Sequence, residues 1–514
     1  MRGGTNRVGT GIGAIIAMAV VLLLLPAPSG LSLAGHAIAA TASGSDRTAS
    51  HGQSVELPSV AHPTWSGGFA GTTTLLGSRA GAATHPGPAS MAPRPAVTGP
   101  PKVLSRFAGV TESTAGGYYP PDTQVAENGI YVFELVNEYG QISSLNGSTA
   151  YSSFTTQAFF NTTSTDNVGD VQVLFDAVSH RWFVTADDFT TNVEHVGVST
   201  SVSPVGTYYR YFYTITLNSA QAQFMDQPVL GISKSLVGIS TNQFNTTTFA
   251  FYGSAMAVFD KTLLESGTYS AQGLGFPTLG SLHPAREITT NGSGTDVLYA
   301  ASTGVFSGST TLSEVEITGP IGNLTTGQLN YGIANTGTVP SALQKGTLTG
   351  LATGDDRVQS VSWSITHILW ISFSTGCRPM GDLTTRSCVR VDAIATAGNV
   401  LKQDATMGIS GKYLFYPAVT ALSAGKGYLM IFGESGATQY PSVLIAGQNT
   451  TDPYGTHRGP TLVFTGSASD LSGRFGDFSG IQLQQIGTRA TAWGATEYDT
   501  STGWATEIVH WAFY

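Results

Sequence analysis

The stretch Gly169-Asp-Val-Gln-Val-Leu-Phe-Asp176 decides the fold, because shortened copies of it recur along the chain. Each copy places a small or acidic residue before an apolar run, and a β-rich aromatic segment follows. Clear copies begin at Pro120, Phe224, Asp355 and Phe475, and weaker ones at Arg286 and Phe415. With positions 122, 170, 226, 287, 356, 417 and 477 as anchors, the repeat returns every 48 to 69 residues. Repeats of this length, filled with short strands and turn residues, are typical of a β-propeller.

The expected fold is therefore all-β, a β-propeller over residues 105–514 with seven blades. Short β-rich runs such as Ile130–Val136 and His367–Phe373 follow their anchors by one strand and one turn. A six-bladed ring is the alternative, because the units at 287 and 417 lack an aspartate. A tandem of β-sandwiches would not explain the aspartate that recurs at predicted strand starts. In a propeller, equivalent positions converge on one central funnel, so scattered aspartates are expected to cluster.

The N-terminus predicts export. Arg2 and Arg7 precede an apolar core of fourteen residues, Ile12–Leu25, and Ala37-Ile38-Ala39 offers a cleavage site. Fourteen helical residues rise about 21 Å, which is short of a hydrocarbon core of about 30 Å. We expect residues 1–39 to be a cleaved signal peptide, with an uncleaved anchor as the alternative, and no stable membrane span after cleavage. The expected localisation is secreted, extracellular or cell-wall associated.

Residues 40–104 predict a flexible linker. They are dominated by Ala, Gly, Ser, Thr and Pro and lack patterned apolar runs. Such a segment cannot bury enough surface to offset the entropy of ordering it. A spacer that holds the domain away from a wall or membrane and a passive propeptide would have the same composition.

Composition favours an extracellular protein and argues against nucleic acid as a partner. Charged residues make up only 11% of the chain, and the 63 glycines suit the turns of a β-protein. A net charge of −9 lacks the clustered basic residues that nucleic-acid binding needs. Cys377 and Cys388 are the only cysteines, and an even count in an exported chain predicts a disulfide. No further ligands at zinc spacing accompany them, so no metal site is expected there.

Four segments together resemble a family of secreted bacterial propeller-like proteins that is mostly uncharacterised. They carry the patterns Pro-Pro-Asp-Thr at Pro120, Gly-Asp-x-Gln-Val-Leu-Phe-Asp at Gly169, Pro-Val-Gly-Thr-Tyr-Tyr-Arg at Pro204 and Gly-Asp-Phe-Ser-Gly at Gly476. The resemblance covers about residues 105–514 and departs at Glu127-Asn-Gly129, where the family has a Gly-Pro turn. It implies a secreted propeller and no particular activity.

Five aspartates stand at predicted starts of innermost strands: Asp122, Asp170, Asp226, Asp356 and Asp477. If they ring one mouth of the funnel, some of their pKa values rise, since closely spaced carboxylates cannot all ionise cheaply. A glycosidase acid/base pair uses that condition, and these five are the candidate catalytic residues. No cofactor is required, although an oxygen-rich funnel can hold a structural Ca²⁺. The plainer hypothesis is that each aspartate accepts backbone N–H bonds from an adjoining turn.

The other candidate binding residues are Arg286, Arg357, His283, Tyr208 and Tyr209. The two arginines are expected near the funnel, where they can bind a ligand or pair with neighbouring aspartates. The aromatic run Tyr208–Tyr213 suits stacking on sugar rings, and equally a strand packed on both faces. The adjacent acids Asp187 and Asp188 at a strand end are expected in a solvated turn.

These observations favour a non-catalytic extracellular binding module that recognises a glycan or a protein through the funnel face. Whether the protein is an enzyme stays open, and the alternative is a glycoside hydrolase that uses two of the aspartates. A third hypothesis is a structural surface-coat component whose aspartates serve the blades. The fold alone does not decide among them, because propellers host enzymes and scaffolds alike.

Overall fold

The computed structural model describes residues 53–55, 99–217, 222–287, 296–304, 306–423, 426–486 and 489–513. The chain divides into two units, Met1–His36 and Ala37–Tyr514, and all described residues belong to the second. The predicted signal peptide and most of the predicted linker therefore lie outside the described residues. None of the helices in the described ranges has the length and apolar character needed to cross a bilayer.

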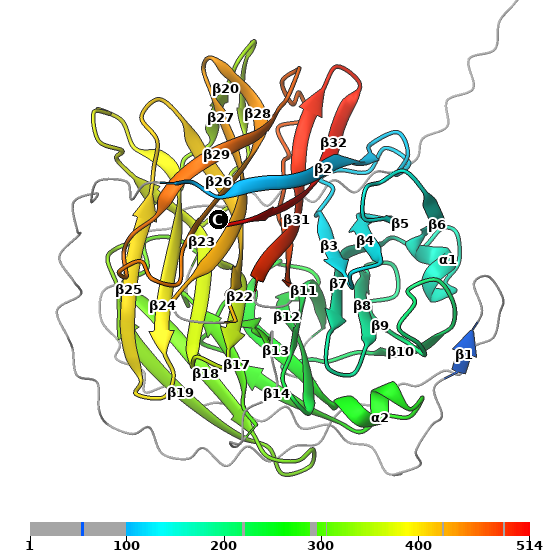
Figure 1. The fold of residues 1–514 in the computed structure, drawn as a ribbon. Helices are drawn as coiled ribbons and strands as arrows, with labels where there is room; N and C mark the ends of the chain where they lie inside the picture. Colours follow the sequence, from blue (N-terminus) through cyan, green and yellow to red (C-terminus); the bar gives the residue numbers. More distant parts are fainter. Residues whose placement is uncertain are drawn as a thin grey trace, which may run out of the picture. The chain divides into compact units, whose positions relative to one another are not determined.

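The protein is a β-propeller (Figure 1). Five of its sheets are separate antiparallel meanders. The first comprises β3 (Gln124–Glu127), β4 (Tyr131–Val136), β5 (Tyr139–Ser144) and β6 (Ala150–Thr155). The second comprises β7 (Val168–Asp176), β8 (Arg181–Asp188), β9 (Val193–Ser199) and β10 (Tyr208–Tyr213), with β1 (Gln53–Val55) paired to β10. Two short helices connect strands. The helix α1 (Thr156–Phe160) follows the first sheet, and α2 (Lys261–Glu265) precedes the last strand of a later meander.

The next two separate sheets have the same up-and-down order. The third comprises β15 (His283–Pro284), β17 (Leu298–Ser302), β18 (Thr311–Thr318) and β19 (Thr325–Gly332). The fourth comprises β26 (Tyr413–Ala421), β27 (Tyr428–Gly436), β28 (Gln439–Gln448) and β29 (Arg458–Thr465).

The fifth sheet joins the two ends of the domain. It comprises β30 (Gly480–Ile486), β31 (Arg489–Thr500), β32 (Gly503–Ala512) and β2 (Lys102–Thr111). β2 pairs antiparallel with β32, so the first strand after residue 99 completes the last sheet of the chain. β2 begins at Lys102, inside the segment for which the composition predicts a linker.

A nine-stranded sheet contains two further four-stranded meanders. One is β11 (Gln223–Ile232), β12 (Leu236–Asn245), β13 (Phe251–Asp260) and β14 (Ala271–Phe276). The other is β22 (Val358–Ser364), β23 (Ile368–Cys377), β24 (Arg386–Ala395) and β25 (Val400–Met407). The two-residue strand β16 (Arg286–Glu287) joins them by parallel pairing on both sides. A small hairpin, β20 (Ala342–Gln344) and β21 (Thr347–Leu351), stands apart from this sheet.

The hydrophobic core lies between neighbouring sheets. Trp370 of β23 packs in one cluster with Tyr428 of β27, their rings 4.7 Å apart, and Val196 of β9 packs in another with Val237 of β12. Because sheets cover both faces of the inner strands, these strands are apolar on both sides, as in the continuous buried run of β23. The outer strands β2 and β19 are covered on one side and alternate between exposed and half-buried residues.

One backbone feature recurs in the first half of each innermost strand or shortly before it. A residue there takes the left-handed conformation, which Gly, Asp and Asn tolerate better than other residues. In three of these strands, β7, β11 and β26, the residue lies in a β-bulge that shifts the pairing register. The left-handed residues are Asp122 (φ 48°), Asp170 (49°), Gln227 (54°), Ser281 (46°), Gly354 (70°), Tyr416 (50°) and Asp477 (37°).

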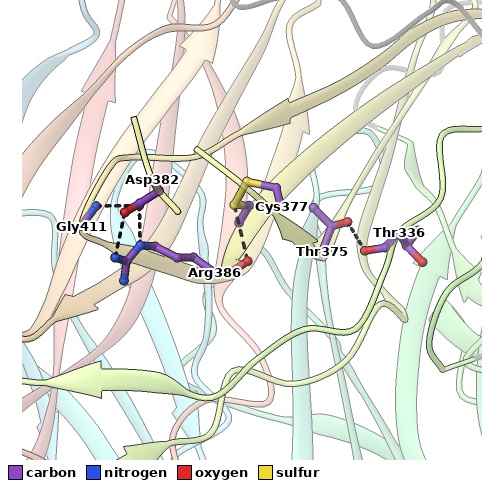
Figure 2. Close-up of a disulfide and its surroundings, with 7 residues drawn as sticks. Thr336, Thr375, Cys377, Asp382, Arg386 and Gly411 are labelled. Atoms are coloured by element: carbon purple, nitrogen blue, oxygen red, sulfur yellow. Dashed lines mark hydrogen bonds and ion pairs between the residues drawn. A yellow bond between two sulfur atoms is a disulfide. The ribbon is translucent and has the colours of Figure 1, made fainter. Parts of the chain in front are cut away.

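The predicted disulfide is confirmed. Cys377 at the end of β23 is bonded to Cys388 in β24, with Cα atoms 5.8 Å apart. Figure 2 shows that the loop closed by the disulfide is also held by an ion pair. Arg386 Nη2 donates to Asp382 Oδ1 at 3.0 Å, and the backbone N–H of Gly411 donates to Asp382 Oδ2 at 2.9 Å.

Candidate functional site

The starts of four innermost strands lie together at one mouth of the propeller. β3 contacts β7 and β30, and β7 contacts β11. Asp122, Asp170, Asp226 and Asp477 lie in the first half of these strands or shortly before them, and Asp477 interacts electrostatically with each of the other three. The structure therefore brings together four of the five aspartates that the repeat singles out.

Burial raises the pKa values of three of these aspartates, Asp122, Asp170 and Asp226. The pKa of Asp122 is held well above its usual range by burial and then by Asp477 and Asp170. The pKa of Asp170 is also held well above its usual range, by burial and then by the charges of Asp226 and Asp187. The carboxyl group of Asp170 lies within hydrogen-bonding reach of Asp122. Burial raises the pKa of Asp226 to about 6, against a lowering by Arg357. Burial and the neighbouring carboxyl groups therefore favour the neutral forms of Asp122, Asp170 and Asp226 more than water does.

Arginine side chains neutralise part of this charge. Arg357 Nε and Nη2 donate to the two carboxylate oxygens of Asp355 at 2.8 and 2.6 Å, and Nη1 donates to the side-chain oxygen of Gln227. Arg474 Nη2 donates to Asp477 Oδ2 at 3.1 Å, and the Arg474 side chain is 53% exposed. We call the following residues the funnel cluster: Asp122, Asp170, Asp226, Asp477, Arg357 and Arg474.

Asp356 lies outside the funnel cluster. Its side chain is fully buried and accepts hydrogen bonds from the Thr336 hydroxyl and, at 3.3 Å, from the backbone N–H of Ser309. Burial raises its pKa. The left-handed residue of this unit is Gly354, two positions earlier. Asp355 pairs with Arg357 of the funnel cluster, whereas Asp356 binds Ser309 and Thr336 of the neighbouring loops.

Arg286 crosses the propeller axis instead of lining its mouth. From β16 its guanidinium donates to the backbone oxygen of Ile481 at 3.2 Å and to the side-chain oxygens of Gln124 and Gln172 at 3.0 and 3.1 Å. Burial lowers its pKa to about 10. Nearby His283 is buried on β15, and burial lowers its pKa to about 3, so its imidazole is neutral.

The two glutamines that bind Arg286 occupy the same position in the repeated pattern, which the sequence already contained. Gln124 and Gln172 each follow an aspartate of the funnel cluster by two positions, in the pattern Asp-x-Gln. Each aspartate stands at the mouth, and each glutamine reaches Arg286 below it. The repeated glutamine therefore closes the axis beneath the funnel cluster.

Tyr208 and Tyr209 lie on β10, between β1 and β9 in the second sheet, and do not join the funnel cluster. The Tyr208 ring is buried, and its hydroxyl donates to the backbone oxygen of Pro204 at 3.0 Å. The Tyr209 ring packs against Gly267. These contacts match the alternative of a strand packed on both faces.

Other aromatic side chains stand exposed beside the mouth. Tyr118 and Tyr119, which are 46% and 55% exposed, lie in the loop that leads to Asp122. Phe189 is 38% exposed, and its ring lies next to Gly169, the residue before Asp170. The sequence signal for the first two was their position directly before the Pro-Pro-Asp motif.

Buried acids extend the funnel cluster into the second sheet. Asp187 and Glu194 face each other across β8 and β9 and are 2% and 0% exposed. Burial raises the pKa of both, that of Glu194 to about 7, and each also influences the other. The prediction of a solvated turn for Asp187 and Asp188 is wrong, because both lie inside β8 where neighbouring sheets cover the strand.

A separate cavity of about 530 Å³ lies near the opposite end of β30. Leu145, Trp493, His510 and the glutamines Gln484 and Gln485 are among its lining residues. Burial lowers the pKa of His510 to about 4, so the cavity is lined by neutral groups. Among the residues in the described ranges, no group of three or more His, Cys, Asp or Glu side chains is arranged to hold a metal ion.

No family model and no curated protein matches the chain. Solved structures similar to it include the polysaccharide lyase Uly1, at 10% identity over 77% of this chain and 90% of the lyase, with a TM-score of 0.38. The extracellular domains 1–2 of Drosophila semaphorin 1b match at 10% identity over 80% and 86% of the two chains, with a TM-score of 0.36. A Trypanosoma rangeli sialidase in complex with 2,3-difluorosialic acid matches at 10% identity over 75% of this chain and 59% of the sialidase, with a TM-score of 0.36.

Proposed function

We propose that the propeller has seven blades, two of them contributed by the nine-stranded sheet. The two halves of that sheet are antiparallel meanders like the separate sheets and are joined only through β16. The innermost strands also contact one another in a closed succession, β3, β7, β11, β15, β22, β26, β30 and again β3. One left-handed residue for each of these strands supports the same count.

We propose that this propeller is an extracellular binding module that recognises a glycan at the funnel cluster. The observation that carries the proposal is the meeting of carboxyl groups from four innermost strands with two arginines at one mouth. These groups offer both donors and acceptors to sugar hydroxyls. The exposed rings of Tyr118, Tyr119 and Phe189 offer apolar faces beside them.

Export to an oxidising compartment is part of the proposal. The bonded pair Cys377 and Cys388 supports it, since disulfides persist outside the reducing cytosol. The secretory signal predicted for residues 1–39 would provide the route.

A polysaccharide panel tests the proposed function, with binding and released reducing sugar recorded together. We expect one glycan class to bind, and Arg474→Ala and Asp477→Asn to weaken that binding by about tenfold or more. Lys402→Ala is the control, because Lys402 is exposed on the outer strand β25. Failure of every glycan to bind would overturn the glycan assignment and turn the search to protein ligands.

A second candidate function, glycoside hydrolysis, is favoured by the coupling of Asp122 with Asp170. Adjacent carboxyl groups with raised pKa values can hold one proton and one charge, as an acid/base pair requires. The same panel distinguishes the two functions. Release of reducing sugar that Asp170→Asn abolishes while the variant stays folded would identify a hydrolase, and binding without release would identify the recognition module.

A further inference from the structure

The side chain of Asn137 joins two carboxyl-bearing residues of the funnel cluster. Asn137 lies in the turn between β4 and β5. Its Nδ2 donates to Asp122 Oδ2 and to the backbone oxygen of Pro120, both at 2.9 Å. Its Oδ1 accepts from the backbone N–H of Asp170 at 2.7 Å. Because Asp122 and Asp170 belong to different sheets, one carboxamide links two neighbouring innermost strands at the mouth.

These contacts decide which way the carboxamide points. The Asp170 N–H can only donate and the Pro120 carbonyl can only accept, so Oδ1 of Asn137 must face the first and Nδ2 the second. Oδ2 of Asp122 is thereby held as an acceptor. The backbone N–H of Gln227 holds Oδ2 of Asp170 in the same way, at 3.2 Å. Oδ1 of Asp122 is buried, and the carboxyl group of Asp170 lies within hydrogen-bonding reach of the Asp122 carboxyl group.

Two other asparagines accept a backbone N–H bond from a neighbouring innermost strand in a similar way. Oδ1 of Asn242 accepts from the backbone N–H of Ser281 at 2.8 Å, and Oδ1 of Asn192 accepts from that of Met225 at 2.9 Å. The linking asparagine is therefore a recurring device of this propeller. Of the three, Asn137 is the one whose amide also donates to a carboxyl group of the funnel cluster.

We propose that Asn137 is the positioning residue of the funnel cluster: its carboxamide holds the carboxyl groups of Asp122 and Asp170 beside each other at the mouth. Any effect of Asn137 on ligand binding rests on the proposed function. The positioning rests only on the contacts of Asn137.

A titration that needs no ligand tests the positioning. Full-length protein labelled with ¹³C at the aspartate carboxyl carbons is followed by NMR, and Asp122→Asn identifies the Asp122 signal. In Asn137→Ala the charged form of Asp122 loses a donor, so its titration midpoint should rise by about one pH unit. The other groups that act on Asp122, namely Asp170, Asp477 and Arg474, are present in every variant compared.

Two further variants keep the test decisive. Asn137→Asp keeps an acceptor for the Asp170 N–H but adds a third carboxyl group, so the Asp122 midpoint should rise again. Asn192→Ala removes a comparable link from the next innermost strand and should leave that midpoint unchanged. An Asp122 midpoint within about 0.3 pH unit of the wild type in both folded Asn137 variants would overturn the proposal. Loss of the fold in both Asn137 variants, with Asn192→Ala intact, would also overturn it by assigning Asn137 a purely structural role.

The positioning and the proposed function can fail separately. If no polysaccharide binds, the titration midpoints of Asp122 still show whether Asn137 acts on Asp122. If a glycan binds, Asn137→Ala should weaken it by about tenfold, whereas Asn192→Ala should not. Equal affinities of the two variants would remove Asn137 from ligand recognition even if the midpoint shifts.

Discussion

The guanidinium of Arg286 on β16 donates a hydrogen bond to the side-chain oxygen of Gln172 on β7, across the propeller axis, at 3.1 Å. The same nitrogen donates to Gln124 at 3.0 Å, and the second terminal nitrogen donates to the backbone oxygen of Ile481. These three acceptors are neutral and come from three different innermost strands. The axis beneath the funnel cluster is therefore closed by a cation that ties together distant parts of the chain.

Replacing Arg286 should destabilise the whole propeller. Arg286→Ala removes the donor from three acceptors, and hydrogen bonds to a charged group contribute about 1.5–3 kcal/mol each, so we expect a loss of about 3 kcal/mol or more in the free energy of unfolding. Arg474→Ala is the matched control, because Arg474 is half exposed with a single ion pair and should cost about 1 kcal/mol or less. Guanidinium unfolding curves measure both. Equal losses for the two variants would contradict the role of Arg286.

The domain should be most stable at acidic pH. Burial raises the pKa of Glu127 and of Asp499 to about 8 and that of Glu134 to about 7. The folded state therefore binds more protons than the unfolded state between the unfolded pKa values near 4 and these raised values. The stability that these groups contribute is fully present below about pH 4 and is lost as the pH rises through 7 to 8. Melting temperatures should fall between about pH 5 and about pH 9, and a rise would contradict the burial of these carboxyl groups in neutral form.

Glu127 offers a specific test of that pH dependence. Its Oε2 accepts from the backbone N–H of Gly129 at 2.6 Å and from Gln484 at 2.8 Å, and a glutamine at this position keeps an oxygen for both donors. We expect Glu127→Gln to match the wild type near pH 5 and to melt at a higher temperature near pH 9. Leu348→Ala, at a fully exposed uncharged position, is the control and should change both melting temperatures equally.

Removing the disulfide should destabilise the protein, and the wild type should contain no free thiol. The bond closes a loop across a sequence separation of 11 residues. Loop-closure entropy predicts a loss of about 3 kcal/mol for the double variant Cys377→Ser with Cys388→Ser. A thiol-labelling assay on denatured, unreduced wild type should detect no free thiol. Labelling at both cysteines would contradict the bond.

Asp356 should matter for stability and not for ligand binding. Its carboxylate is fully buried and serves Thr336 and Ser309, so Asp356→Ala leaves their donors without an acceptor. We expect a loss of about 1–3 kcal/mol in the free energy of unfolding, measured by chemical denaturation. Affinity for any glycan found by the panel should be unchanged, and a selective loss of affinity would place Asp356 in the site.

Calcium should leave the melting temperature unchanged. Arg357 and Arg474 already supply positive charge at the funnel cluster, and the burial that raises the pKa values of Asp122 and Asp170 disfavours the charged carboxylates that a cation needs. Thermal melts of the full-length protein in EDTA and in calcium chloride test this expectation. A higher melting temperature in calcium that an excess of magnesium does not reproduce would establish a Ca²⁺ site instead.

The repeat predicted the positions of funnel-cluster aspartates because the backbone at the repeated position is left-handed. Asp122, Asp170 and Asp477 occupy the left-handed position directly, and aspartate is among the residues that tolerate it. In two other units the left-handed residue is Gln227 or Tyr416, which does not match the repeated pattern. The anchors chosen from the sequence, 226 and 417, therefore lie one residue away from the left-handed position. At Gly354 the slip is two residues, which is why the sequence pointed to Asp356. Arg474 and Asn137 were missed because neither belongs to the repeated pattern.

The sequence by itself determined the all-β class, the repeat, the cysteine pair and the aspartates at strand starts. Each of these depends on local physics: strand patterning, turn residues, the left-handed backbone and the even count of cysteines. The tertiary structure alone decided which side chains meet. Asn137 reaches Asp170 from 33 positions away, Arg286 reaches Gln172 from 114, and β2 completes the last sheet by pairing with β32. Such contacts follow from how the sheets are arranged around the axis, and no local pattern contains that information.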